Sequence, residues 1–380
     1  MTAKNRLAIG LIGSGYMGRA HAIAFRSAAA VFDLPLEPKL VLLGDVDAAT
    51  AQRAAAQLGF ERSTGEWRDL ISDPHIDLVD VTTPNRLHVE MVMAAIAAGK
   101  NVYCEKPLAP TAAEAGQLMR AAETAGVKTM VGFNYLKNPI TVLAKEIIDS
   151  GEIGEVFGFR GNHFEDYMLD PNTLVSPWRL DRRSGDGVTA DLGSHVVSLA
   201  RFLVGPIESV CADRSIVIPE RRSPTGEVVK IDVADEVYSL VRFQNGARGT
   251  LAASWLGTGH KMGLGFEVRG TKGALVVDFE RFNELELYRA DQRVGREGFT
   301  RVLAGPAHRD FAQFVPAPGH QLGFNDLKAI EVRDLVEGLA AADRSPWPDF
   351  REAWEVQRVI DAIIESDRRR SWAAVADIDG

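Results

Sequence analysis

A lysine follows a short apolar run in the stretch "YCEKPLAP", residues 103–110. The run "NVYCE" (101–105) has the pattern of a buried strand, and Pro107 provides the turn that ends it. Lys106 therefore lies at the carboxyl edge of a predicted sheet, where an ammonium group can donate to a substrate hydroxyl and stabilise a developing alkoxide. The alternative from this stretch alone is a solvated surface lysine.

A second pair with chemical potential lies in "DLGSH", where Asp191 and His195 are four residues apart. On one helix this spacing puts both side chains on the same face. A histidine can accept a hydroxyl proton, and a carboxylate can orient the same or a neighbouring hydroxyl. A surface helix pair is one alternative. We expect no metal site, because one Asp–His pair lacks the three or more ligands that a metal requires.

The third motif, "GSGYMG", has the spacing G-x-G-x-x-G at Gly13, Gly15 and Gly18. It follows the apolar run "LAIGLIG" and opens an alanine-rich helix, the context in which this motif cradles a dinucleotide pyrophosphate. Ser14, Tyr16 and Met17 lie within the same turn. Asp45 follows the second predicted strand, where its carboxylate can bind both adenosine ribose hydroxyls and repel a 2′-phosphate. The motif therefore predicts NAD rather than NADP.

Elements that alternate between strand and helix surround these motifs in the first half of the chain. We predict strands at 7–13, 39–46, 76–83, 101–105 and 128–133, with helices at 17–30, 48–58, 88–99 and 111–125 between them. This alternation is typical of an α/β Rossmann domain with a doubly wound parallel sheet. After about residue 150, strands follow strands, which predicts an α+β domain with an open, mostly antiparallel sheet. Helices are expected at about 187–203, 325–342 and 349–367.

The composition is that of a globular protein without a nucleic-acid or membrane partner. The 380 residues carry a net charge of −9, whereas nucleic-acid binding favours basic patches. No apolar run approaches the length of a membrane helix, and the N-terminus is not a signal peptide. The two cysteines lie in unrelated contexts and fit a reducing compartment. We therefore expect a cytoplasmic protein of two domains, 1–134 for NAD and 135–380 for substrate and oligomer contacts, with the last helices able to pack back on the first domain.

Five motifs together resemble the Gfo/Idh/MocA sugar and polyol oxidoreductases over nearly the whole chain. They are "GSGYMG", "TTPNRLHVEM", "EKPLA", "GFNYLKNP" and "GDGVTADLGSHVVSLARFLVG". The resemblance implies hydride transfer from a secondary carbinol carbon to NAD⁺, with Lys106, Asp191 and His195 as the catalytic residues. It leaves open whether Lys106 or His195 is the formal base.

The resemblance also implies the residues that bind the cofactor. Besides the glycine turn and Asp45, these are Thr83, Pro84, Asn85, His88, Glu105, Lys106, Asn134, Trp178 and Arg179. His88 can equally be a surface histidine in the first turn of its helix. The arginine that many members carry near Tyr135 or Leu136 is absent here, so the chain departs from the family pattern beside Asn134.

For the substrate, the chain offers a mixture of hydrogen-bonding groups and an aromatic wall, which suits a small cyclic polyol or sugar. The candidate residues are Lys106, Asn134, His163, Asp166, Arg179, Asp191, His195 and His320. Arg179 can alternatively be a structural ion-pair residue, and His320 a solvent-exposed loop histidine.

The segment "PAPGHQLGFNDLKAIEVRDLV" (316–336) resembles a subgroup with inositol and unusual-sugar dehydrogenases. It implies scyllo- or myo-inositol, or L-glucose, as the substrate, with levoglucosan dehydrogenases or another sugar 3-dehydrogenase as the alternative. It also implies a homotetramer in which His320 reaches a neighbouring site. An NAD-dependent glycosidase of the same family and a non-catalytic NAD-sensing module are further alternatives, and the presence of all three catalytic residues counts against the sensing module.

Overall fold

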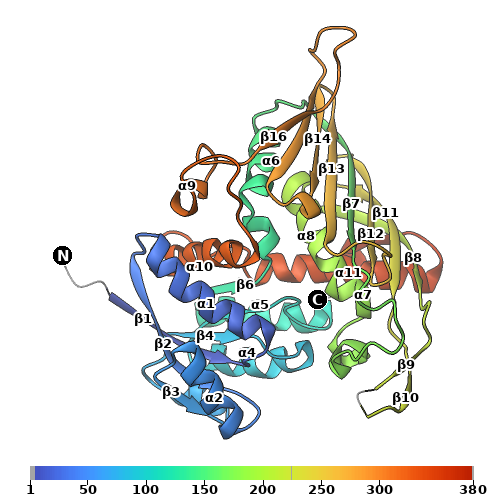
Figure 1. Cartoon of the computed structure of the whole chain (residues 1–380). Helices are drawn as coiled ribbons and strands as arrows, with labels where there is room; N and C mark the ends of the chain where they lie inside the picture. The colour runs from blue at the N-terminus through green and yellow to red at the C-terminus, as the bar shows by residue number, and fades with distance from the viewer. Residues whose placement is uncertain (1–4, 224, 379–380) are drawn as a thin grey trace.

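The first half of the chain forms a parallel sheet with helices on both faces, in a computed structural model that describes residues 5–223 and 225–378. The six strands lie in the order β3-β2-β1-β4-β5-β6 and all pair in parallel. In Figure 1 this half occupies the lower left, in blue to cyan. The strands are β1 (Asn5–Ile12), β2 (Leu36–Gly44), β3 (Arg62–Thr64), β4 (Leu78–Val81), β5 (Asn101–Cys104) and β6 (Thr129–Val131). Strand β4 is buried at every position, as a strand covered on both faces must be.

Two helices of this half begin at capping residues that can be recognised in the sequence. The helices of this half are α1 (Tyr16–Val31), α2 (Ala48–Leu58), α3 (Arg68–Ser72), α4 (His88–Ala97) and α5 (Ala112–Ala125). Asp47 caps α2 by accepting from the Thr50 N–H, and Thr111 caps α5 by accepting from the Glu114 N–H. The strand order reverses between β1 and β4, so a crevice opens at the carboxyl ends of these two strands.

The second half contains a nine-stranded sheet in the order β16-β15-β14-β13-β7-β12-β11-β8-β17. All described neighbours in this sheet are antiparallel except β7 and β12, which are parallel. The strands are β7 (Val156–Phe164), β8 (Ile207–Ser215), β11 (Glu236–Phe243), β12 (Arg248–Ser254), β13 (Gly263–Gly270), β14 (Gly273–Asp278), β15 (Glu284–Arg289), β16 (Thr300–Leu303) and β17 (Ala373–Ala374). A separate hairpin pairs β9 (Glu220–Arg222) with β10 (Val228–Lys230).

Helices cover one face of the second sheet and connect the two halves. They are α6 (Pro139–Asp149), α7 (Gly187–Asp191), α8 (Gly193–Val204), α9 (Phe311–Phe314), α10 (Phe324–Ala340) and α11 (Phe350–Arg369). Helix α8 packs on β7 and β12, whereas the opposite face exposes Phe157, Tyr238 and Leu240. Helices α10 and α11 run between the two halves, with α10 packed on α1 and α11 on α5 (Figure 1).

The predicted fold class is confirmed, with three differences in the elements. The single helix predicted at about 187–203 is two helices, α7 and α8, because the chain turns at Leu192. The long loop 298–323 contains β16 and α9. Helices α3 and α6 and the short strands β3, β9, β10, β16 and β17 were not predicted. For the strands the reason is their length, because runs of two to four residues carry little periodicity.

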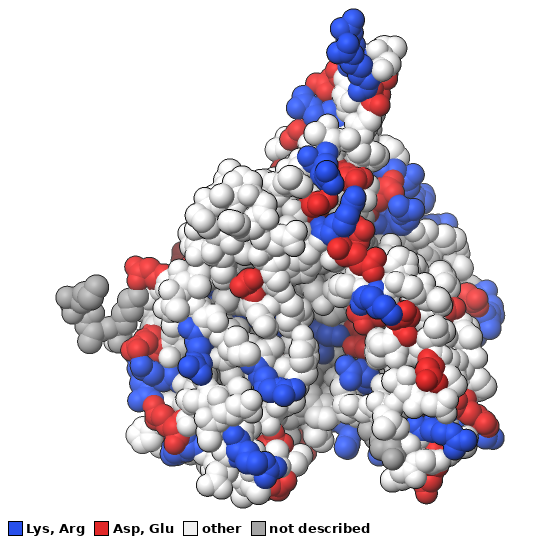
Figure 2. Space-filling model, in the orientation of Figure 1, with Lys and Arg blue, Asp and Glu red and all other residues white. Residues whose placement is uncertain are grey.

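The described surface and helices bear on possible partners. None of the helices within residues 5–223 and 225–378 has both the length and the apolar character needed to cross a membrane. On the face shown in Figure 2, acidic and basic side chains are interspersed.

Candidate active site

The glycine motif forms a cradle at the start of α1. A Cβ at Gly18 would lie 2.0 Å from the Gly13 carbonyl oxygen, so only glycine allows this helix to pack so close to the end of β1. A Cβ at Gly15 would meet nothing within 4 Å and would project into open space. Gly15 caps the helix without a side-chain hydrogen bond, which leaves the first N–H groups of α1 free to bind an anion. The cradle thus has the shape and polarity that a pyrophosphate requires.

Asp45 lies beside the cradle, directly after β2, and its carboxylate is fixed by three donors. Oδ2 accepts from the Ser14 N–H at 2.8 Å and from the Ser14 hydroxyl, and Oδ1 accepts from the Val46 N–H at 2.7 Å. The carboxylate therefore stays at the edge of the cradle, where a ribose would lie.

Lys106 follows β5 and points toward α7 from the first half of the chain. Its Nζ donates to the Asp191 carbonyl oxygen at 2.8 Å and to Asp191 Oδ1 at 3.0 Å. The two side chains are 14% and 17% exposed, so the ion pair is largely shielded but reachable from the cleft. Two of the three ammonium protons are thus engaged, and the third is available for a ligand.

Asp191 is the centre of a wider set of donors. Its Oδ2 accepts from the Tyr167 hydroxyl and from Trp255 Nε1, each at 3.3 Å, and Arg179 Nε lies 3.7 Å away. Burial alone would raise the pKa of Asp191, but the charges of Lys106 and Arg179 outweigh it and hold the pKa well below its usual range. Asp191 therefore remains ionised at neutral pH.

His195 lies in α8, one turn beyond the break at Leu192, rather than on the helix of Asp191. Both side chains nevertheless line the same cleft. Burial, together with the charge of Lys106, moves the pKa of His195 well below its ordinary value of 6.5. The imidazole is therefore neutral at physiological pH and can accept a proton. The Tyr135 ring packs edge-on against it, with centroids 4.7 Å apart.

Glu165 and Tyr167, which follow the predicted His163, also reach the cleft. His163 Nε2 lies 3.1 Å from Glu165 Oε1, and Tyr167 follows at the same two-residue interval. Both lie beyond the end of β7 at Phe164, in the loop that follows the strand, so the alternation of a strand does not predict them. Neither Glu165 nor Tyr167 is among the residues predicted from the sequence, where Asp166 is the candidate instead.

These groups line one cleft of about 1020 Å³ between the two halves of the chain. The predicted site residues that line it are Gly13, Ser14, Gly15, Tyr16, Met17, Asp45, Thr83, Pro84, Asn85, Glu105, Lys106, Asn134, His163, Trp178, Arg179, Asp191 and His195. Further lining residues that were not predicted include Trp67, Tyr135, Glu165, Tyr167, Met262 and Phe324. Phe324 begins α10 and lies against Tyr16, with ring centroids 5.8 Å apart.

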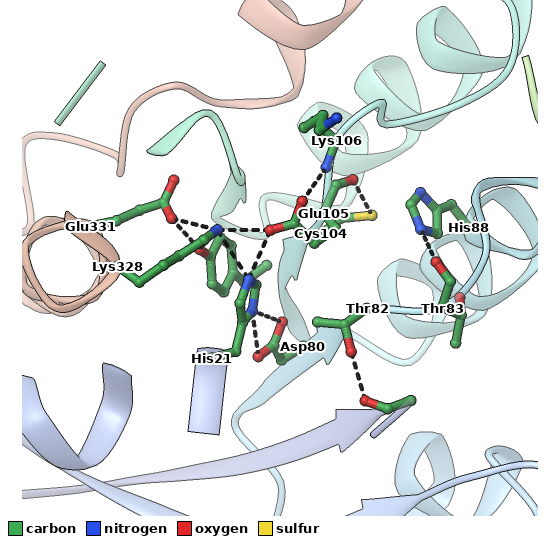
Figure 3. Close-up of polar contacts among 12 residues, drawn as sticks. His21, Asp80, Thr82, Thr83, His88, Cys104, Glu105, Lys106, Lys328 and Glu331 are labelled. Atoms are coloured by element: carbon green, nitrogen blue, oxygen red, sulfur yellow. Dashed lines mark hydrogen bonds and ion pairs between the residues drawn. The ribbon is translucent and has the colours of Figure 1, made fainter. Parts of the chain in front are cut away.

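Three predicted residues lie outside the lining of this cleft. His88 is fully buried, with Nε2 2.8 Å from the Thr83 carbonyl (Figure 3). Its Nδ1 lies 2.9 Å from the Pro107 carbonyl. Burial lowers the pKa of His88, so the ring is neutral and its single N–H donates to one of these two carbonyls. His88 is therefore not a surface histidine. Asp166 lies in the loop after β7 and pairs with Lys261 at 2.7 Å. His320 is exposed on its own chain.

Unsatisfied polar atoms gather in the lining. Among the described residues, the buried atoms Asn134 Nδ2, His163 Nδ1, Arg179 Nε and His195 Nδ1 have no hydrogen-bond partner. Buried polar groups are normally paired, so this concentration is typical of a ligand site. In the described part of the chain, no group of three or more His, Cys, Asp or Glu side chains is arranged to hold a metal ion.

The parallel sheet, the phosphate cradle and the ribose-side carboxylate define an NAD-binding oxidoreductase. Comparison with known proteins agrees: residues 7–133 match the oxidoreductase family with an NAD-binding Rossmann fold, and residues 141–276 match the GFO/IDH/MocA C-terminal domain. The chain belongs to the Gfo/Idh/MocA family of oxidoreductases, which includes sugar and polyol dehydrogenases.

Some relatives of this chain cover between 66% and 98% of its length. Levoglucosan dehydrogenase of Pseudarthrobacter phenanthrenivorans is 38% identical, with 98% of this chain and 99% of the relative covered. A solved structure of levoglucosan dehydrogenase with NADH and levoglucosan superposes with a TM-score of 0.94, at 38% identity over 97% of this chain and 99% of that one. An NAD-binding oxidoreductase from Klebsiella pneumoniae is 46% identical, with a TM-score of 0.93 over 97% and 99% of the two chains. The scyllo-inositol 2-dehydrogenase of Bacillus subtilis is 30% identical over 66% of this chain and 70% of the relative.

Proposed function

We propose that the protein oxidises a secondary hydroxyl of a neutral cyclic sugar or polyol, with NAD⁺ as the hydride acceptor. The observation that carries the proposal is the convergence of Lys106, Asp191 and His195 on one cleft that also contains the dinucleotide cradle. When bound, the cofactor supplies the acceptor carbon for the hydride. The glycine turn and Asp45 would hold its pyrophosphate and ribose, and Asn134 its nicotinamide end.

The residues of the chain would handle the hydroxyl proton and the developing negative charge. The free proton of the Lys106 ammonium donates to the substrate oxygen and stabilises the alkoxide as it forms. Neutral His195 accepts the hydroxyl proton. Asp191 keeps the ammonium in place and can receive a neighbouring hydroxyl. We assign the base to His195 because Lys106, an ammonium held by the Asp191 carboxylate, is suited to donate rather than to accept.

The substrate class follows from the lining of the cleft. Trp178 and Tyr167 offer apolar surfaces, and His163 and Glu165 offer hydrogen-bonding groups. Arg179 faces Asp191 and stacks over the Trp178 ring, with its Cζ 4.5 Å from the ring centroid. With that arginine already opposed by a carboxylate and Glu165 nearby, the cleft favours a neutral substrate over a sugar phosphate.

Among neutral substrates, we place levoglucosan first. The relative of that name matches this chain at 38% identity over nearly its full length, whereas the scyllo-inositol dehydrogenase matches 66% of the chain. The inositols and L-glucose remain further candidates. This order revises the expectation from the sequence, which put the inositols first.

We also propose that the protein is a homotetramer in the cytoplasm. The support is the uncovered face of the second sheet, with exposed Phe157, Tyr238 and Leu240, together with the exposed His320 in the segment before α10. In such an assembly His320 can reach a neighbouring cleft. Light scattering during size-exclusion chromatography tests the assembly, and a monomeric mass would contradict it.

The function is tested by mixing the purified protein with levoglucosan, scyllo-inositol, myo-inositol, L-glucose and D-glucose in the presence of NAD⁺ or NADP⁺. We expect NADH to accumulate with at least one of the cyclic substrates. Lys106→Met should lower kcat by roughly 100- to 1000-fold while NADH still binds. Asp166→Asn is the matched control, because this carboxylate lies outside the lining of the cleft and pairs with Lys261.

Two results would overturn the proposal. The first is an absence of turnover with every cyclic substrate, and the second is an unchanged kcat in the Lys106→Met variant. Cleavage of a nitrophenyl glycoside without accumulation of NADH would instead identify a glycosidase that uses NAD⁺ transiently.

A further inference from the structure

A cluster of buried charges lies behind the cleft, between the carboxyl edge of the parallel sheet and α10 (Figure 3). Its members come from four elements that are far apart in the sequence. They are His21 of α1, Asp80 of β4, Glu105 after β5, and Lys328 and Glu331 of α10. Each is at most 5% exposed. Burying charges is unfavourable unless they pair, so this cluster requires an explanation.

Glu105 connects the cluster to the catalytic lysine. Its Oε1 accepts from Lys328 Nζ at 2.7 Å and lies 2.9 Å from His21 Nε2. Its Oε2 accepts from the backbone N–H of Lys106 at 3.1 Å. One carboxylate thus joins a helix near the C-terminus to the backbone of the residue that faces Asp191, and Glu105 also lines the cleft.

Lys328 is the cation that keeps this carboxylate ionised. Burial alone would raise the pKa of Glu105, but Lys328 first, and then His21, lower it far below its ordinary value. Lys328 is in turn held by Glu105 and by Glu331, the latter at 2.8 Å. An ionised Glu105 is a stronger acceptor for the Lys106 N–H than a protonated one.

His21 completes the support from the other side. Its Nδ1 lies 3.0 Å from both carboxylate oxygens of Asp80, and its Nε2 lies between Glu105 and Lys328 Nζ, at 2.9 and 3.1 Å. Burial would lower the pKa of His21, but Asp80 and Glu105 raise it above the ordinary value. The Glu105 carboxylate is therefore held from two directions.

The absence of a side chain at Gly132 leaves room for the ion pair between Glu105 and Lys328. A Cβ at that position would lie 2.6 Å from Glu105 Oε1 and 3.1 Å from Lys328 Nζ. A side chain there would therefore push the two charged groups apart. The glycine in "VGFN" permits the close contact of α10 with the sheet edge.

We propose that Lys328 is a positioning residue for catalysis, acting through Glu105 on the backbone of Lys106. The inference rests on the proposed function for its kinetic test. Lys328 touches neither cofactor nor substrate, because it is fully buried behind Glu105. Its contribution is to hold the ammonium of Lys106 at the point where it faces Asp191. The second half of the chain thereby completes a catalytic group of the first.

The test uses the double variant Lys328→Met with Glu331→Gln, which removes one charge of each sign and leaves the net charge of the cluster unchanged. The matched control is Lys137→Met with Asp334→Asn. That pair is also largely buried, also anchors α10 with a contact of 2.7 Å, and lies outside the cleft. A merely structural role of Lys328 predicts the same kinetic effect for both variants.

We expect kcat of the test variant to fall by about 10- to 100-fold, because small displacements of a catalytic group are costly. The Kd for NADH should stay within about threefold of the wild-type value, and the control variant should keep its kcat. Amide hydrogen exchange gives a second readout that needs no substrate. The Lys106 amide should exchange at least about tenfold faster in the test variant.

Equal kcat values in the test and control variants, or an unchanged exchange rate at Lys106, would overturn the inference. If the double variant fails to fold, Gly132→Ala displaces the pair without removing a charge, and it should produce the same faster exchange. An inactive wild type would count against the proposed function alone, because the exchange measurement still decides the role of Lys328.

Discussion

The cofactor preference can be changed at one carboxylate. Asp45 stands where the adenosine ribose is expected, and its three donors prevent it from turning away. In Asp45→Asn, the amide oxygen can still accept from the Ser14 N–H, but the negative charge is gone. We expect this variant to bind NADPH more tightly than the wild type does, while its affinity for NADH falls only modestly.

The size of the effect follows from the electrostatics of the site. Two unit charges 4 Å apart repel by about 1 kcal/mol in water and by about 4 kcal/mol at the effective dielectric constant near a protein surface. A 2′-phosphate carries about 1.5 to 2 charges, and Asp45 is only partly buried. We therefore take the repulsion between Asp45 and the 2′-phosphate as about 2–4 kcal/mol, which corresponds to a roughly 30- to 1000-fold change in the ratio of the affinities for NADH and NADPH.

The assay is a fluorescence titration of wild type and variant with NADH and with NADPH. High salt should reduce the wild-type discrimination, because exposed charges are screened. Asp47→Asn is the control: Asp47 caps α2, is exposed, and lies outside the lining of the cleft, so its loss should leave the ratio unchanged. A Kd for NADPH that is the same in Asp45→Asn and in the wild type would refute the electrostatic reasoning.

Three further predictions concern pH and stability. Burial and the charge of Lys106 hold the pKa of His195 well below 6.5, so kcat/KM for the oxidation should fall only at pH values well below 6.5. The fall should move to higher pH in Lys106→Met, where a charge that lowers this pKa is missing. A pH–rate profile with the same acid limb in both proteins would contradict this. His88→Leu removes the buried ring N–H that donates to one of the Thr83 and Pro107 carbonyls. Urea denaturation should therefore show a loss of about 1–3 kcal/mol in the free energy of unfolding, and an unaltered midpoint would count against this. Burial raises the pKa of Asp361 from 3.8 to about 6, so the folded state binds its proton more tightly than the unfolded state does. The wild type therefore loses up to about 3 kcal/mol of folding stability as pH rises from about 4 to 6. Asp361→Asn should be more stable than the wild type at pH 8 and equally stable near pH 4, and an equal difference at both pH values would disprove the assignment.

Much of the fold could be predicted because its signals are local. Apolar runs, caps such as Thr111 and the terminal glycines of α2 and α5 are written in neighbouring residues. The short elements were missed since two to four residues give no period. The break at Leu192 was not predicted either, because "DLGSH" has good helical spacing and Leu192 itself keeps helical backbone angles.

The same contrast between what local sequence predicts and what it does not applies to the residues of the candidate site. Lys106, Asp191 and His195 were found from motif spacing, whereas Glu165 and Tyr167 lie in the loop after β7, where no repeating pattern marks them. His88 was assigned to the cofactor because it follows "TTPN", yet both of its ring nitrogens face carbonyl groups of its own chain. A sequence gives the type of a side chain but not the direction in which it points.

The sequence by itself determined the parallel sheet, the phosphate cradle, the preference for NAD and the identity of the catalytic candidates, because each depends on residues within a short window. Only the tertiary structure decided which of them meet. Lys106 and Asp191 are 85 residues apart, and Lys328 lies 223 residues beyond Glu105, so no local pattern relates them. Their contacts exist because α7 faces the carboxyl edge of the first sheet and α10 returns to pack on α1, which brings buried charges together that are stable only as partners.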